Sequence, residues 1–214
     1  MKKYIYILLI IPLLSLNAQK IGELAPEKPP MNLPDNAIGL DLMIGEGGFG
    51  LGTFYRYNYS NTFTGFMDFS ISESKGQREV ERFDIFGFPL PVSGKKNRVF
   101  LLPINFGVQY RLFAQSLTDN LRPYIAVGVG PTMFVTTPAE EEFFKSFGNA
   151  KAEFGLGGYV GFGANFGINA SNLTGINLRY YVHHLFNDGI EQYLGDFQNT
   201  MQQASITINI GIMY

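Results

Sequence analysis

The residues with the clearest potential for catalysis are two adjacent histidines, His183 and His184. Hydrolases and acyltransferases place a histidine beside a nucleophilic hydroxyl and an acidic group. The chain contains no Cys, which excludes a thiol nucleophile and zinc–thiolate sites. Neighbouring residues of a strand point to opposite faces, so the two imidazoles do not share one metal ion without a bulge. We therefore predict neither a metal site nor a bound cofactor.

A lipid-modifying enzyme is the catalytic interpretation that stays open. His184 precedes Asp188 and Glu191, and Ser205 falls on the next segment that reads as a strand. No Ser follows His184 closely, and Ser205 is expected nearer the middle of its strand. We therefore predict no catalytic residues and a structural hydrogen bond for the histidine.

The segments that position these residues alternate in polarity. From Gln203 to Tyr214 the apolar side chains fall on one face and the polar ones on the other. A strand with one lipid-compatible face and a terminal aromatic is typical of transmembrane barrels. Seven further segments share the pattern, with outward residues such as Leu40, Tyr57, Phe69, Phe106, Val127, Phe162 and Leu178. The prediction is an all-β fold, an eight-stranded antiparallel up-and-down transmembrane β-barrel over residues 37–214.

The start of the chain has the features of a secretion signal. Lys2 and Lys3 precede an apolar run from Tyr4 to Leu16, and Ala18 ends a plausible cleavage site. The run is shorter than the roughly 20 residues that a spanning helix needs. We predict a signal peptide over residues 1–18, with a retained helical anchor as the alternative. A Pro-rich periplasmic lead-in follows over residues 19–36.

The lengths of the connections indicate an orientation. Residues 59–62, 114–121 and 169–173 form compact connections, whereas residues 75–97, 137–151 and 187–201 form longer ones. Outer-membrane barrels have short periplasmic turns and longer external loops. We therefore expect a bacterial outer-membrane protein with both chain ends in the periplasm. The alternative is a secreted soluble β-barrel, which would bury its apolar faces inside.

Three stretches support a family resemblance: "SITINIGIMY", "GLGGYVGFGANFGIN" and "TGINLRYYVHHLF". In these the chain resembles the small eight-stranded outer-membrane barrels of the opacity, OmpX and OmpW type. The resemblance implies an architecture and leaves the activity open. It also implies insertion by the barrel-assembly machinery through the C-terminal strand ending at Tyr214. The OmpW-like resemblance adds a small hydrophobic ligand as a possible partner.

The opposite, inward faces of the strands carry charged residues. The lumen of an eight-stranded barrel is just wide enough for its side chains to fill, and buried charges there must be paired. We predict a polar plug in which Arg56, Arg111 and Arg179 bond Asp41 and Asp68, with His183 in the same lumen. Inward glycines such as Gly157 and Gly161 are expected to make room for Phe54, Phe66 or Tyr181. The alternative is a charged constriction in a narrow conduit.

The expected external loops carry the candidates for surface interaction. The sequence Thr137-Pro138-Ala139-Glu140 has the form of a helix capping box, and Gly148 is a suitable stop. This predicts a short helix that either folds over the barrel mouth or contacts a lipid, a ligand or a protein. Basic clusters at this height bind anionic head groups such as those of lipopolysaccharide. The loop candidates are Phe86, Phe88, Phe143, Phe144, Phe147, Lys95, Lys96 and Arg98.

Composition limits the function classes. The chain has 20 Phe, 12 Tyr and 25 Gly, only 16% charged residues and a formal net charge of −2, so no nucleic-acid partner is indicated. We expect a non-enzymatic barrel with a side-chain-filled lumen and a structural or surface-interaction role in the envelope. The alternatives are a narrow channel for small or hydrophobic solutes and a lipid-modifying enzyme.

Overall fold

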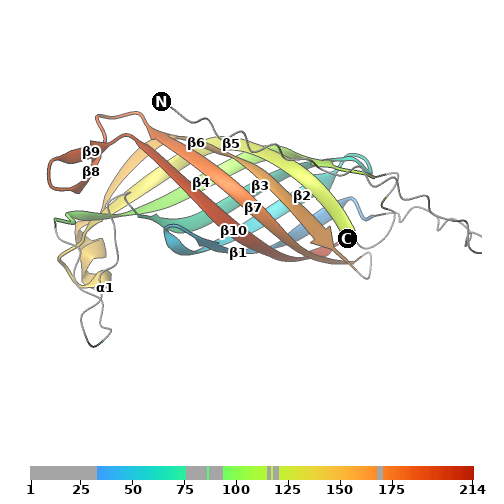
Figure 1. The fold of residues 1–214 in the computed structure, drawn as a ribbon, viewed down its shortest axis with the longest axis horizontal. Coiled ribbons are helices and arrows are strands. Elements are labelled where there is room, and N and C mark those ends of the chain that lie inside the picture. Colours follow the sequence, from blue (N-terminus) through green and yellow to red (C-terminus); the bar gives the residue numbers. More distant parts are fainter. Residues whose placement is uncertain (1–32, 76–85, 87–93, 115–116, 118–120, 168–170) are drawn as a thin grey trace, which may run out of the picture.

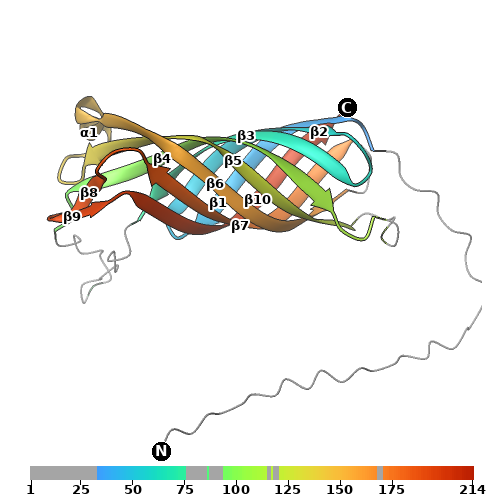
Figure 2. The ribbon, with the colours of Figure 1, turned by 90° about the horizontal axis from the view of Figure 1, so that it is seen from above.

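The computed structural model describes residues 33–75, 86, 94–114, 117, 121–167 and 171–214. Eight antiparallel strands close into a barrel in the order β1-β10-β7-β6-β5-β4-β3-β2 (Figures 1 and 2). The barrel strands are β1 (Asn36–Gly45), β2 (Gly48–Asn58), β3 (Phe63–Ser74), β4 (Asn97–Arg111), β5 (Leu121–Pro138), β6 (Lys151–Phe166), β7 (Asn172–Leu185) and β10 (Thr200–Met213). This is the predicted architecture, and the pairing of β1 with β10 leaves the sheet without a free edge.

The outer face of the barrel is apolar, as the alternation predicts. Exposed side chains follow one another at every second position of each strand, for example Ile206, Ile210 and Ile212 on β10. Tyr55, Tyr57, Tyr59, Phe63, Tyr110 and Tyr214 gather near the end of the barrel that holds both Asn36 and Tyr214. Aromatic girdles of this kind mark the boundary of the hydrocarbon layer. The alternative of a soluble barrel with its apolar faces inside is excluded by this surface.

The two ends of the barrel differ, and we name them by their connections. The turn end holds the connections β2–β3, β4–β5 and β6–β7 and both ends of the barrel sequence. The loop end holds the connections β3–β4, β5–β6 and β7–β10, together with the tight turn between β1 and β2. By the rule that outer-membrane barrels keep short turns and chain ends inside, the turn end faces the periplasm.

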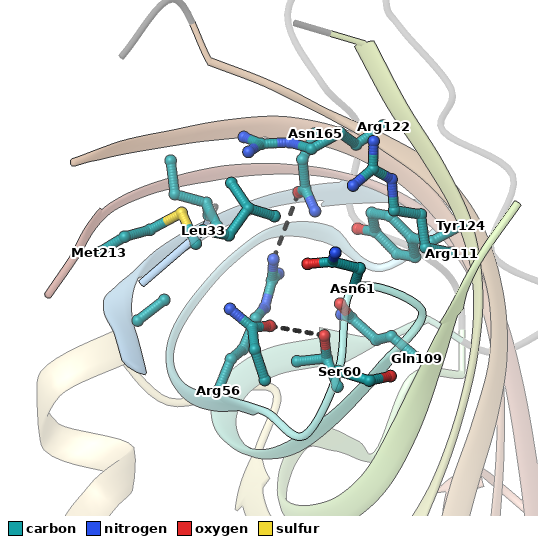
Figure 3. A pocket seen from close by; sticks show the side chains of 14 residues that line it. Leu33, Arg56, Ser60, Asn61, Gln109, Arg111, Arg122, Tyr124, Asn165 and Met213 are labelled. Carbon is teal, nitrogen blue, oxygen red and sulfur yellow. Dashed lines mark hydrogen bonds between the residues drawn. The ribbon is translucent and has the colours of Figure 1, made fainter. Parts of the chain in front are cut away.

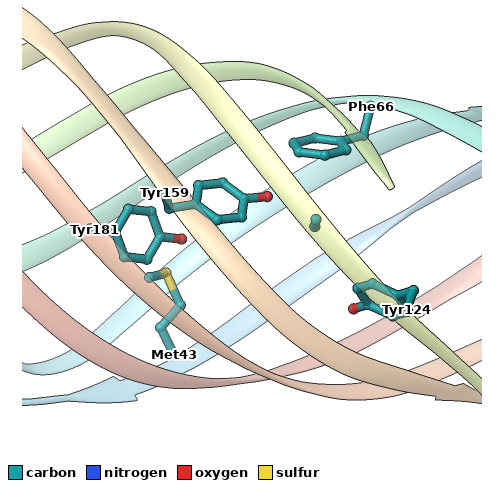
Figure 4. Packing of buried hydrophobic residues seen from close by; sticks show 6 residues of the cluster. Met43, Phe66, Tyr124, Tyr159 and Tyr181 are labelled. Atoms are coloured by element: carbon teal, nitrogen blue, oxygen red, sulfur yellow. The ribbon is translucent and has the colours of Figure 1, made fainter. Parts of the chain in front are cut away.

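Aromatic side chains fill the middle of the lumen. Tyr159 and Tyr181 lie with their ring centroids 4.9 Å apart, and Phe66 stacks on Tyr159 at 5.9 Å. Figure 4 shows these rings with Met43 and Tyr124, all pointing inward from different strands. Phe66 lies over Gly107 and Gly128, whereas Gly157 faces His183. Glycines do make room for the ring of Phe66, but they are Gly107 and Gly128 and not Gly157 as predicted.

The loop end of the lumen is closed by a separate apolar cluster. Its members are buried and come from four strands and the last connection: Val99, Leu101, Phe134, Leu185, Ile190 and Met201. Ile190 belongs to a small hairpin made of β8 (Ile190–Tyr193) and β9 (Asp196–Gln198). This hairpin docks on β3 and β4: the amide of Lys96 donates to the carbonyl of Gln192 at 2.8 Å, and the side chain of Gln192 donates to the carbonyl of Ser74 at 3.2 Å. The hairpin therefore helps to cover the mouth.

The predicted surface helix exists but begins later than expected. Strand β5 continues to Pro138, and the helix α1 covers only Phe143–Ser146, followed by the 3-10 turn η1 (Phe147–Asn149). Thr137 pairs with Arg98 of β4 in the sheet, and its hydroxyl has no hydrogen-bond partner. The capping-box prediction was wrong because the ladder hydrogen bonds of a long strand outweigh a single local cap.

The helix also lies beside the barrel and does not fold over the mouth. Phe143 and Phe147 pack against Phe100, with ring centroids 6.1 and 5.6 Å away. Phe100 follows the outward register of β4, two residues before Leu102 and four before Ile104. Figure 1 shows α1 on the flank of the loop end, away from the hairpin β8–β9. The predicted signal peptide, most of the lead-in and Phe88 lie outside the described residues.

Candidate functional site

A charged network spans the middle of the lumen and centres on Arg179. Its Nη2 atom lies 2.8 Å from Oδ2 of Asp41, and Nη1 lies 3.7 Å from Oδ2 of Asp68. Its Nε donates to the amide oxygen of Asn177 at 2.8 Å, and Nη1 donates to the hydroxyl of Tyr181 at 3.1 Å. The guanidinium also lies 4.9 Å from the ring centroid of Tyr159. One arginine of β7 therefore bridges two carboxylates, one on β1 and one on β3, the two strands that flank β2.

Both carboxylates of the network are fully engaged. The Tyr159 hydroxyl donates to Oδ2 of Asp68 at 2.8 Å, and the side chain of Asn105 donates to Oδ1 at 3.0 Å. Asn209 donates to Oδ1 of Asp41. All of these side chains are buried. Buried charges that are paired and also hydrogen-bonded make a rigid unit, which fills the lumen at this level.

The other two arginines predicted for this network have different partners. Arg56 donates to the side-chain oxygen of Asn165 at 3.3 Å and lies over the ring of Phe54 at 4.2 Å. Arg111 donates to the carbonyl of Leu117 at 2.7 Å. The prediction that they bond Asp41 and Asp68 was wrong, because both arginines lie near the turn end of their strands and the carboxylates lie near the middle. Alternation predicts which face of the sheet a side chain lies on, but not its position along the barrel axis relative to residues of other strands.

A third arginine, Arg122, also lies at the turn end and was not among the predicted residues. Its side chain is 5% exposed, and none of its three guanidinium nitrogens has a hydrogen-bond partner. The signal that could have found it is the alternation of β5: Ile125, Val127 and Val129 face outward, so Tyr124 and Arg122 face inward. Arg56, Arg111 and Arg122 line one cavity (Figure 3).

The histidines lie on opposite sides of the wall, as their adjacency predicts. His183 is buried in the lumen, where its Nδ1 lies 3.0 Å from the Thr132 hydroxyl and its ring stacks on Tyr181. His184 is exposed, with Nδ1 2.8 Å from the hydroxyl of Thr200. Ser205 is a lumenal residue five positions further along β10 than Thr200, which is roughly 17 Å along a strand. The structure therefore does not bring a histidine and Ser205 together.

The basic loop candidates are used to hold the loop end together. Arg98 donates to the carbonyls of Ala139 and Glu141, at 3.0 and 3.3 Å. Lys95 lies 3.6 Å from Glu73, and Lys96 forms an ion pair with Glu191. Hydrogen bonds from Lys96 and from the backbone N–H of Gly195 hold the pKa of the Glu191 carboxyl below its ordinary value. These contacts fix the start of β4 against its neighbouring loops.

The apolar loop candidates are exposed to different degrees. Phe143 and Phe147 are half covered by Phe100, whereas Phe144 is 82% exposed and Phe86 is 78% exposed. Four further apolar side chains are exposed at the same end of the barrel, on β6, after β7 and on the hairpin. We define the loop-end apolar surface as Phe144, Phe154, Phe186, Leu194 and Phe197. Clusters of large exposed apolar side chains commonly mark sites that bind a ligand, a lipid or another protein.

The closed sheet, the apolar belt and the polar, filled lumen define the class: this chain is a small eight-stranded outer-membrane β-barrel. No protein-family model and no curated protein matches the chain in sequence.

Several solved structures share the fold. Neisserial surface protein A is 9% identical with a TM-score of 0.48, covering 84% of this chain and 94% of that one. Ail, the attachment invasion locus protein of Yersinia pestis, is 12% identical with a TM-score of 0.42, covering 83% and 95%. The outer membrane enzyme PagL is 14% identical with a TM-score of 0.40, covering 81% and 98%. The likeness is one of fold.

The described residues hold no group of three or more His, Asp or Glu side chains that could bind a metal ion. Within the same residues, no helix has the length and apolar character to span a bilayer.

Proposed function

We propose that this protein is a non-enzymatic, non-conducting barrel that acts at the cell surface through its loop-end apolar surface. The observation that supports it is the filling of the lumen. The Arg179 network occupies the middle, and six buried apolar side chains occupy the loop end. With the interior filled, the exposed side chains Phe144, Phe186 and Phe197 are the groups available for recognition.

The chemistry of this surface favours an apolar partner. Lys95, Lys96 and Arg98 already contact groups of this protein, so the basic loop residues offer less to an anionic head group than the sequence suggested. The aromatic side chains lie at the rim and on the hairpin, where the outer leaflet meets the external medium. An outer-leaflet lipid chain, a small hydrophobic ligand or an apolar face of another envelope protein fits them.

The first experiment is conductance of the refolded protein in planar bilayers, with folding checked by heat-modifiable gel mobility. We expect folded protein to be silent. Tyr181→Ala combined with Phe134→Ala, which removes one ring from the middle of the lumen and one from the loop-end cluster, serves as the control that openings are detectable. Discrete, reproducible openings of the unaltered protein would overturn the non-conducting part and favour the channel for small or hydrophobic solutes.

The surface part is tested with a photo-crosslinking residue introduced at Phe144 in intact cells. We expect discrete adducts from this position and none from Tyr59, an exposed aromatic at the turn end. Adducts should weaken when Phe186 and Phe197 are replaced by Ser. No adduct from any residue of the loop-end apolar surface would end the surface proposal. For the non-enzymatic part, His184→Ala should leave the lipid A and phospholipid profiles unchanged.

A further inference from the structure

The turn end of the lumen contains a cavity whose charge is one-sided. Fourteen residues line it, including Arg56, Arg111 and Arg122, and none of them is Asp or Glu. The rest of the polar lining consists of neutral side chains: Asn58, Ser60, Asn61, Thr64, Gln109, Tyr124 and Asn165. Figure 3 shows the arginines and amides from several strands directed toward the same space. The cavity has a volume of about 40 Å³, roughly the space of three water molecules.

Arg122 is the group whose surroundings require an explanation. It is 5% exposed, and all three nitrogens of its guanidinium lack a hydrogen-bond partner. Its charge lies close enough to those of Arg111 and Arg56 to be repelled by both. A buried guanidinium is always charged, and burying that charge without a partner carries a large energetic cost. Nothing in the described residues offsets this cost, because the ion pairs they form lie at the loop end and in the middle of the lumen.

The neighbouring arginines are also incompletely used. Arg111 leaves its buried Nε without a partner, and Arg56 makes a single 3.3 Å hydrogen bond to Asn165. Guanidinium groups bind planar and tetrahedral oxyanions through paired N–H donors. Three of them around one small cavity match a doubly charged oxyanion better than a single carboxylate.

We propose that Arg122, with Arg56 and Arg111, forms a binding site for a phosphate group at the periplasmic mouth of the lumen. The group enters from the turn end, where the cavity opens, and its oxygens accept hydrogen bonds from the free guanidinium nitrogens. The neutral amides of Gln109 and Asn165 complete the lining. The phosphate group comes either from the periplasm as a free or soluble phosphate or from the head group of an inner-leaflet phospholipid.

The test is calorimetric titration of the full-length folded barrel in a phosphate-free maltoside detergent, with inorganic phosphate as the probe and chloride at matched ionic strength as the blank. We expect saturable binding that weakens at least tenfold in Arg122→Met. Arg122→Lys keeps a charge but loses the paired donors, so its loss should be intermediate. Lys145→Met removes one positive charge from exposed α1 and should leave binding unchanged. Arg111→Met is the second variant if Arg122→Met does not fold, and we expect at least a threefold loss.

A second titration identifies the source of the phosphate group. Short-chain phosphatidylglycerol is added before inorganic phosphate. Competition by this lipid supports the site and assigns it to a head group, whereas phosphate binding without competition supports the site and assigns it to a soluble phosphate. Absence of saturable phosphate and lipid binding by the folded protein overturns the proposal. Binding that is equal in the unaltered protein, Arg122→Met and Arg111→Met overturns it as well.

Discussion

Buried arginines at two levels of the same lumen differ in whether they have acidic partners. In the middle, Arg179 serves two carboxylates and is hydrogen-bonded on all sides. At the turn end, three arginines share one cavity without an acidic residue in its lining. In the first arrangement the guanidinium nitrogens of Arg179 all have partners within the protein, so no donor is free to bind a ligand. The second lacks an acidic partner among the described residues, and this difference separates a structural unit in the middle from the binding site proposed at the turn end.

The largest expected effect is a loss of folding stability when the central arginine, Arg179, is replaced. Arg179→Met leaves Asp41 and Asp68 buried without a counter-charge, and we expect the free energy of unfolding to fall by about 3–5 kcal/mol. The measurement is urea unfolding of the protein refolded in lipid vesicles. A loss below about 1 kcal/mol would show that the central network is not the structural unit described here.

A smaller loss is expected within the same network. Tyr159→Phe removes the hydroxyl that donates to Asp68 at 2.8 Å and leaves the ring in place. Hydrogen bonds to charged groups are worth more than neutral ones, so we expect a loss of about 2 kcal/mol. Tyr180→Phe is the matched control, since its hydroxyl bonds Gln202 on the exposed outer face. Equal losses in the two variants would contradict a special role for the buried carboxylate.

At the turn end, replacing an arginine is expected to raise the free energy of unfolding and not to lower it. In phosphate-free buffer, Arg122→Met replaces an unpartnered buried charge with an apolar side chain, and we expect unfolding to become harder by about 1 kcal/mol. The same urea titration measures it. Adding phosphate should reverse the ranking, because the unaltered protein binds it more tightly and is therefore stabilised more than the variant. Destabilisation by Arg122→Met in phosphate-free buffer would place this arginine in the same class as Arg179.

The smallest effect is expected for an exposed ion pair, which gives a reference for both buried levels. The pKa of Glu191 is lowered by Lys96 and by the amide of Gly195, so its contribution is present above the ordinary value of 4.5 and is lost as the pH falls through the lowered pKa. The amide resonance of Gly195 should therefore titrate with a midpoint below 4.5. Glu191→Gln should abolish this titration without changing global unfolding. A midpoint at or above 4.5 would contradict the hydrogen bonds described.

The sequence was sufficient for the strands and for the face of each residue, but not for the partners of the lumenal charges. Alternation of period two correctly put Asp41, Asp68 and Arg179 inside and Ile206 outside. Which of them meet depends on strand tilt and on the register around the whole barrel, and neither can be read from one segment. This is why Arg179 of β7 reaches Asp68 of β3, whereas Arg56 does not, although Arg56 lies on β2, which pairs directly with β3.

The loop end shows a second limit. The Phe-rich stretch was recognisable, yet its helix starts five residues after Pro138 and lies on the flank. A local capping signal says nothing about how far the preceding strand continues in the sheet. The mouth is covered by the β8–β9 hairpin, whose short strands carry little alternation of their own. Tertiary contacts therefore decided both features.

The seam between the first and last strands has a consequence for assembly. Asp41 lies on β1 and its partners Asn209 and Arg179 lie on β10 and β7, so the hydrogen bond to Asn209 crosses the junction that closes the cylinder. Until β10 has been synthesised and joined to β1, the carboxylate has neither partner beside it. Chains truncated before Thr200 would therefore carry an uncompensated charge as well as two open edges. Closure of the barrel and pairing of the Asp41 carboxylate are therefore one event, in which the last strand supplies both the missing edge and a missing hydrogen-bond donor.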